Sequence, residues 1–147
     1  VQLAELGEPS LRAAAPAGPE TYRAIVATSF HGTAVVRFDV APDGGGTLTL
    51  WNPDGYCTNL AIRRTEPHTT ALSQQQVDGV LGAIEEAGFW TLGLRGTSSG
   101  LDGTDWYLEG ARGGTHRLVH RSTPGEPLRT VAESFTAAAG CLHRPVE

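Results

Sequence analysis

Lysine is absent from this 147-residue sequence, so all eleven basic residues are arginines. Schiff-base chemistry needs a lysine amine, and a P-loop needs a lysine beside the nucleotide phosphates, so both are excluded. Sixteen acidic residues give a net charge of −5, and the arginines form no basic stripe along the chain. The sequence therefore predicts no nucleic-acid partner, because a phosphate backbone is bound mainly through clustered basic side chains.

Cysteine is scarce, and long apolar runs are missing. The two cysteines, Cys57 and Cys141, are too few for a four-cysteine zinc site and form no CxxC redox motif. Three interpretations stay open for the pair: a disulfide, which we expect, two inert buried thiols, or one catalytic cysteine. No apolar run approaches the ~18 residues of a membrane-spanning helix, so we expect no transmembrane segment in this chain.

Methionine is also absent, and the sequence starts at Val1. A processed export signal, a shortened chain or a fragment of a longer protein would each explain this start. We expect export, with a lipid anchor upstream of Val1 as one option, and therefore an extracytoplasmic location (periplasmic, cell-surface or secreted). Residues 1–20 are rich in Ala, Pro and Glu without a sustained period, which predicts a flexible tail or linker that is dispensable for folding.

From Thr21 onward the apolar pattern predicts one α+β domain, covering residues 21–147. Alternation of apolar and polar residues predicts six strands, at residues 21–27, 33–41, 47–51, 57–64, 105–112 and 115–122. Apolar stripes at helical spacing predict two helices, at residues 73–88 and 127–142. The order ββββ-α-ββ-α indicates an antiparallel sheet of about six strands with two helices on one face.

Two patterns that resemble catalytic or metal sites are weak. The segment from Gly96 to Gly100 matches the G-x-S-x-G elbow, but it leads into a strand, whereas the elbow must begin a helix. We therefore interpret it as a flexible or turn-forming loop. His116 and His120 lie on an expected strand, where four residues span roughly 13 Å, too far to share one ion. We expect no metal and no other cofactor.

The expected hairpin at residues 105–122 carries the best candidate site. A two-residue Gly113-Gly114 loop would pair Arg112 with Thr115 and give the two faces of the ribbon different characters. We expect the face that carries Trp106 to pack against the core. Trp106 and Arg121 are then structural residues, and they form a cation–π pair. The polar face carries Asp105, Tyr107, Glu109, His116, Leu118 and His120. An ordinary solvated sheet face is the alternative explanation for these residues.

Candidate roles follow from the residue types on the polar face. For recognition we single out Tyr107, Glu109, His116 and His120. For acid–base catalysis the candidates are Asp102, Glu109, His116 and His120, since a carboxylate beside an imidazole is the usual arrangement for proton transfer.

The second half of the chain resembles a known group of domains. Phe89-Trp90 is followed by Leu101-Asp102-Gly103-x-x-Trp106-x-x-Glu109, and then by His116 and Arg121-x-x-Pro124. Between about residues 73 and 142, this pattern resembles an uncharacterised group of small bacterial exported or lipoprotein-type domains. The resemblance implies an envelope location and assigns no activity. It marks as positions of interest Asp102, Gly103, Trp106, Glu109, His116, Arg121 and Pro124.

Three classes of function fit these features. We expect a non-enzymatic extracytoplasmic binding or interaction domain, such as an inhibitor, an immunity-type protein or an accessory lipoprotein, with another envelope or secreted protein as its partner. One alternative is a hydrolase that uses Asp102, Glu109 and a histidine of the hairpin. The other is a small-ligand carrier or structural domain, which would need an apolar pocket between the sheet and the helices.

Overall fold

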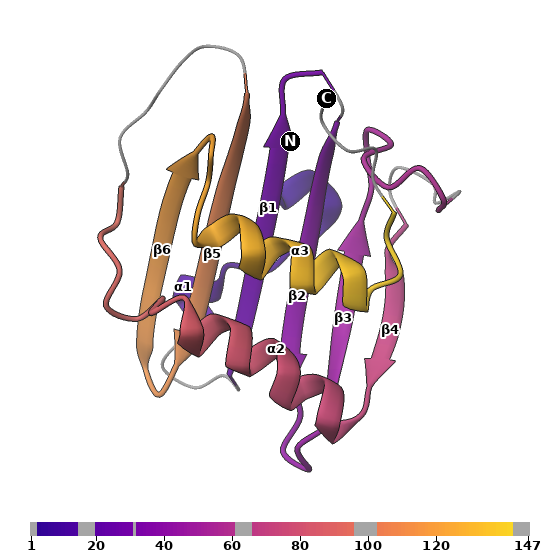
Figure 1. Cartoon of the computed structure of the whole chain (residues 1–147). Coiled ribbons are helices and arrows are strands. Elements are labelled where there is room, and N and C mark those ends of the chain that lie inside the picture. The colour runs from indigo at the N-terminus through magenta and orange to yellow at the C-terminus, as the bar shows by residue number, and fades with distance from the viewer. Residues whose placement is uncertain (1–2, 15–19, 31, 61–65, 96–102, 143–147) are drawn as a thin grey trace.

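Alternating apolar residues assemble into one antiparallel sheet of six strands, in the order β4-β3-β2-β1-β5-β6 (Figure 1). The computed structural model describes residues 3–14, 20–30, 32–60, 66–95 and 103–142. The strands are β1 (Thr21–Thr28), β2 (Thr33–Val40), β3 (Gly46–Trp51), β4 (His68–Leu72), β5 (Thr104–Arg112) and β6 (Thr115–Ser122). Helices α2 (Gln74–Glu86) and α3 (Leu128–Ala138) lie together on one face of the sheet. The predicted α+β class and the order ββββ-α-ββ-α are confirmed.

The face covered by α2 and α3 holds the main core. Its fully buried side chains include Tyr22, Phe38, Leu48, Phe89, Leu108 and Phe135. The packing is close enough to dictate a glycine in β5, because a Cβ on Gly110 would lie 2.8 Å from the Phe89 ring and 2.9 Å from the Tyr22 ring. Helix α2 begins with the capping box expected from Ser73 and Gln76, each side chain bonding to the backbone N–H of the other.

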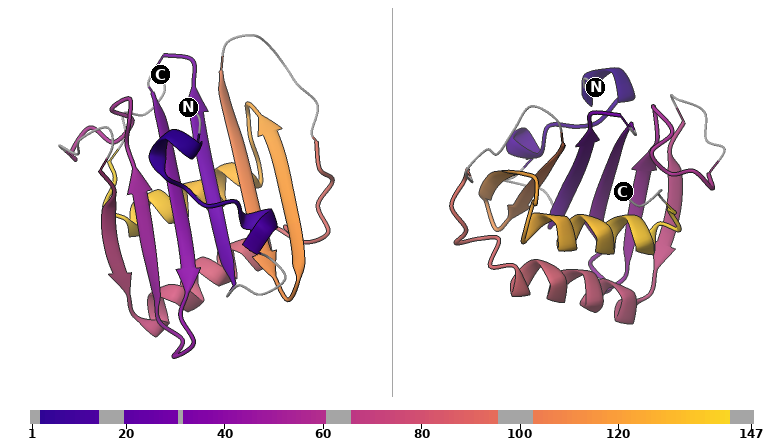
Figure 2. Two further views of the ribbon diagram at one scale, coloured as in Figure 1. Left: turned by 180° about the vertical axis from the view of Figure 1, so that it is seen from behind. Right: turned by 45° about the horizontal axis from the view of Figure 1, so that its top comes forward.

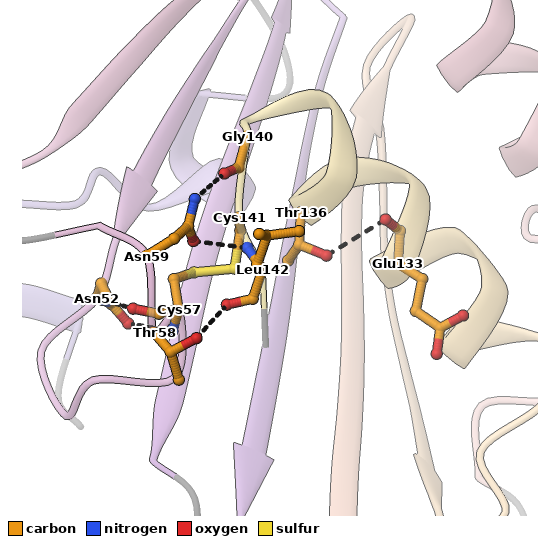
Figure 3. The surroundings of a disulfide bond; sticks show 9 residues. All are labelled: Asn52, Cys57, Thr58, Asn59, Glu133, Thr136, Gly140, Cys141 and Leu142. Carbon is orange, nitrogen blue, oxygen red and sulfur yellow. Dashed lines mark hydrogen bonds between the residues drawn. A yellow bond between two sulfur atoms is a disulfide. The ribbon is translucent and has the colours of Figure 1, made fainter. Parts of the chain in front are cut away.

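The disulfide Cys57–Cys141 joins two positions 84 residues apart, and it confirms the expected pairing (Figure 3). Asn59 reinforces it by donating to the carbonyl of Gly140 and accepting from the backbone N–H of Leu142. The residues around Cys57 therefore attach the end of α3 to the rest of the domain.

The fourth strand is not where the sequence predicted it. We expected it at residues 57–64, but residues 57–60 form a bend and a turn, and β4 begins at His68; residues 61–65 lie outside the described part of the chain. The side chain of Asn59 and the backbone of Thr58 bond to the segment after α3, which holds this stretch out of the sheet.

The N-terminal segment packs on the face of the sheet opposite to α2 and α3 (Figure 2). It contains a 3-10 turn, η1 (Leu3–Leu6), and a single helical turn, α1 (Leu11–Ala14), rather than the flexible tail expected from composition. Leu6 and Leu11 are buried, with 7% and 2% of their surface exposed. Two leucines five residues apart are too few to produce a detectable period, so their spacing predicts neither a helix nor a strand.

Candidate functional site

The β5–β6 hairpin has the register that the sequence predicted. Gly113 and Gly114 both have positive φ, 57° and 80°, as a two-residue hairpin loop requires. Arg112 therefore pairs with Thr115, and Tyr107 pairs with His120. The odd residues of β5 and the even residues of β6 share the face opposite to α2 and α3, which is the expected polar face.

Trp106 lies on the helix-covered face, where it is 8% exposed and belongs to the main core. Gly125 is packed so closely against its ring that a Cβ there would lie 2.3 Å from it. The expected cation–π pair with Arg121 is wrong, because the Arg121 guanidinium donates to the carbonyls of Gly93 and His120. Arg121 thereby attaches β6 to the chain that follows α2.

The polar face of the hairpin holds two separate histidine–carboxylate pairs. In the first, Nε2 of His116 lies 2.7 Å from Oε2 of Glu109. Oε1 of Glu109 accepts from the guanidinium of Arg23 on the neighbouring strand β1. Both carboxylate oxygens are thus engaged, and the side chains of His116 and Glu109 are only 11% and 16% exposed.

Glu109 belongs to a network of charges that crosses three strands. Arg23 on β1 pairs in register with Arg37 on β2 and with Glu109 on β5. Glu8 of the N-terminal segment lies between the two arginines: it forms a close ion pair with Arg37 and lies 3.5 Å from Arg23. Its side chain is 1% exposed. Asp39 completes the network with a 3.0 Å ion pair to Arg37.

Sequence reasoning missed Glu8, Arg23 and Arg37 as members of this network. The two arginines occupy outward positions of expected strands, which is ordinary for a solvated face. Had the pairing of the strands been known, two arginines opposite each other on central strands would have indicated a shared anion, because like charges directly opposite destabilise a sheet.

In the second pair, Nε2 of His120 lies 2.8 Å from Oδ1 of Asp105. The hydroxyl of Ser122 donates to the same oxygen at 2.8 Å. Both hydrogen bonds lower the pKa of Asp105, and the bond from His120 has the larger effect. An ionised carboxylate only accepts hydrogen bonds, so Nε2 of His120 carries the proton. The ring of Tyr107 stacks on the ring of His120, with centroids 4.5 Å apart.

The second pair does not have the geometry of an activated nucleophile. A catalytic serine must give its proton to a histidine nitrogen, whereas Ser122 donates to the carboxylate that also holds His120. Asp102, the other catalytic candidate, lies outside the described residues. Over the described ranges, no group of three or more His, Cys, Asp or Glu residues could hold a metal ion. The hydrogen bond to Asp105 and the stack on Tyr107 together hold the imidazole of His120 in one orientation.

The His120–Asp105 pair is open to solvent, whereas the His116–Glu109 pair is largely buried. Asp105 and His120 have side chains 44% and 33% exposed. Leu118 lies between the two histidines on β6 and is 47% exposed. We call the residues Tyr107, Leu118 and His120, with Asp105 at their rim, the hairpin patch. Beside it, the backbone N–H of His120 donates to the carbonyl of Leu94, which is itself 55% exposed.

Within the described part of the chain, no helix is both long and apolar enough to cross a membrane. No protein-family model matches this sequence, and no curated protein matches it either.

Proposed function

We propose that this chain is a non-enzymatic binding domain that acts outside the cytoplasm and contacts another envelope or secreted protein through the hairpin patch. The observation that carries the proposal is the Tyr107–His120 stack, held in place by Asp105 beside the exposed Leu118. Tyrosine is enriched among the residues that dominate binding energies. Side chains already fixed in one orientation lose little conformational entropy when a partner binds.

The disulfide supports the proposed location. Disulfides form and persist in oxidising compartments, and they are rare in the cytosol of ordinary bacteria and eukaryotes. Cys57 and Cys141 are buried, and both flank segments that hydrogen-bond to each other, so the bond is part of the fold rather than a surface thiol pair.

The two alternative functions have less support. A hydrolase of the expected kind would use Glu109 as an acid or base, but both oxygens of Glu109 are engaged, by Arg23 and by His116. Ser122 donates to Asp105 and not to a histidine nitrogen. A small-ligand carrier would need an apolar cavity between sheet and helices. That space is filled by aromatic side chains in mutual contact, with the rings of Phe38 and Phe135 5.7 Å apart.

Site-specific cross-linking tests the proposal. A photoreactive amino acid replaces Leu118 in one preparation and Leu142, a leucine 66% exposed near the disulfide, in a matched control. Each preparation is irradiated with the envelope and secreted fractions of the source organism. We expect a discrete cross-linked protein at position 118, absent at position 142 and lost when Tyr107→Ala is added. Identical products at both positions, or none at position 118, would contradict the proposed surface.

A further inference from the structure

Four side chains of the N-terminal segment cover its part of the sheet. Leu6 packs against Val35 and Trp51 with the partly buried Leu3 beside them, and Leu11 packs against Ala111. Glu8 lies between them, opposite Arg23 and Arg37. The surface beneath the segment thus has an apolar contact on each side of a pair of arginines, and a short peptide can meet both kinds of contact at once.

The segment takes its shape from its own hydrogen bonds rather than from pairing with a strand. The backbone N–H of Glu8 donates to the carbonyl of Leu3, and that of Gly7 donates to the carbonyl of Ala4, both at 3.1 Å. Gly7 has a φ of 75°, so the turn closes with the Schellman arrangement that favours glycine. A peptide of the same sequence contains every group needed to form this turn.

The sheet does not depend on Glu8 to neutralise its arginines. Arg23 keeps Glu109 as a partner, and Arg37 keeps Asp39. Leaving one charge buried without a partner is the most expensive consequence of breaking an ion pair, and here departure of the segment avoids it.

Among the described residues, three buried polar atoms of the segment and of the sheet beneath it have no hydrogen-bond partner: Oε1 of Glu8, Nε of Arg23 and Nε1 of Trp51. Buried polar groups in folded proteins are nearly always satisfied, so these atoms are available to a peptide that places a donor or acceptor beside them. The carbonyl of Pro9, which accepts from Arg23 at 2.8 Å, is the remaining polar contact of the segment with this arginine.

We propose that this face of the sheet, lined by Arg23, Val35, Arg37 and Trp51, is a binding site for an acidic peptide segment of a partner protein, and that residues 3–14 occupy it in cis. The peptide has a glutamate at its centre, with an aliphatic residue two positions before it and another three positions after it, as Leu6, Glu8 and Leu11 are spaced. The site is separate from the hairpin patch and does not require that the patch bind anything.

The proposal is tested by cutting the link between residues 3–14 and the folded domain, so that an added peptide can replace them. A recognition site for a specific protease is inserted between residues 14 and 20 of the full chain, and the folded protein is cleaved. A fluorescent peptide with the sequence of residues 3–14 is then added. Binding is followed by anisotropy, and release of the original fragment by gel filtration and mass spectrometry.

We expect the labelled peptide to displace the original fragment, and to bind the uncleaved chain at least tenfold more weakly, because a tethered segment competes at high effective concentration. A peptide carrying Glu8→Gln should bind at least tenfold more weakly than the native peptide. A peptide carrying Glu5→Gln is the matched control and should bind within twofold of it, because Glu5 is exposed and loses the same charge.

Three results would overturn the proposal. The original fragment does not exchange with excess peptide, or the domain loses its fold when the fragment leaves; in either case the segment is a permanent structural element. Equal binding of the Glu8→Gln and Glu5→Gln peptides would show that the arginines do not select a carboxylate at this place.

Discussion

The two faces of the sheet are covered in different ways. On one face, α2 and α3 pack over fully buried aromatic and aliphatic side chains such as Phe38 and Phe135, and the disulfide attaches the end of α3. On the other face, the central strands present Arg23 and Arg37, and a short N-terminal segment covers them with three leucines and one glutamate. Two regular helices cover the first face, whereas a short segment without a regular apolar repeat covers the second.

This difference separates stability from binding. The helix-covered face buries large apolar area, which is the main source of folding free energy. The opposite face has two smaller apolar clusters, and it carries the network of Glu8, Arg23, Arg37 and Glu109 together with the hairpin patch. Variants on the helix-covered face should therefore mainly lower the free energy of unfolding, and the largest losses of stability should come from there. Variants on the opposite face should mainly weaken binding of a partner.

Removing the disulfide should have the largest effect. For the 84 residues between Cys57 and Cys141, the chain-entropy relation gives roughly 4.5 kcal/mol of stabilisation. The double variant Cys57→Ser, Cys141→Ser should lose free energy of unfolding of this order, measured by urea denaturation without reductant. A loss below about 1 kcal/mol would mean that the other contacts of α3 hold the C-terminal part in place without the covalent bond.

Trp106→Ala should come next, with a loss of about 4 kcal/mol in the free energy of unfolding, as for other large core aromatics. Its neighbour Tyr107 on the opposite face is the matched comparison, and Tyr107→Ala should cost about 1 kcal/mol or less. Denaturation curves of the two variants measure the contrast between the faces directly. Equal losses would show that the hairpin patch is part of the folding core.

The sequence predicted those elements whose signals are local and repeated. The architecture was predicted from the alternation in β1, β2, β5 and β6 and from the capping box at Ser73. The hairpin register was predicted from the two glycines Gly113 and Gly114. The register in turn placed Tyr107 opposite His120 and assigned Trp106 to the core side.

Other features depend on contacts that no local pattern encodes. The stretch after Cys57 has the composition of a strand, but Asn59 bonds to the C-terminal segment instead. The packing of residues 3–14 depends on Leu6, Glu8 and Leu11, whose partners lie on the four strands β1, β2, β3 and β5. Arg121 binds carbonyls rather than Trp106, because the chain after α2 passes beside β6. Each of these is a long-range pairing, visible only once the strands are placed.

Glu8→Gln should lower the free energy of unfolding by about 2 kcal/mol, within the range of about 1.5–3 for hydrogen bonds to charged groups. The loss is moderate because Arg23 and Arg37 keep other carboxylate partners. Glu5→Gln serves as control and should change stability by less than about 0.5 kcal/mol. If both variants behave alike in denaturant, the N-terminal segment adds nothing to stability through its charge.

The smallest effect belongs to Asp105, at the exposed rim of the hairpin patch. Hydrogen bonds from His120 and then Ser122 lower its pKa in the folded state, so the unfolded chain binds this proton more readily. The resulting stability is fully present above the unfolded pKa of about 3.9 and is lost as the pH falls through the lower folded value. It should be at most about 1 kcal/mol, since the side chain is partly screened by solvent.

NMR titration of the Asp105 carboxyl carbon measures this pKa directly. In the His120→Ala variant the pKa should rise toward the ordinary value, because the largest cause of its lowering is removed. Ser122→Ala should raise it by less, since the hydroxyl is the weaker of the two hydrogen-bonding causes. An unchanged pKa in His120→Ala would mean that His120 is not held by Asp105 in solution. The Tyr107–His120 stack would then lack the fixed orientation on which recognition by the hairpin patch depends.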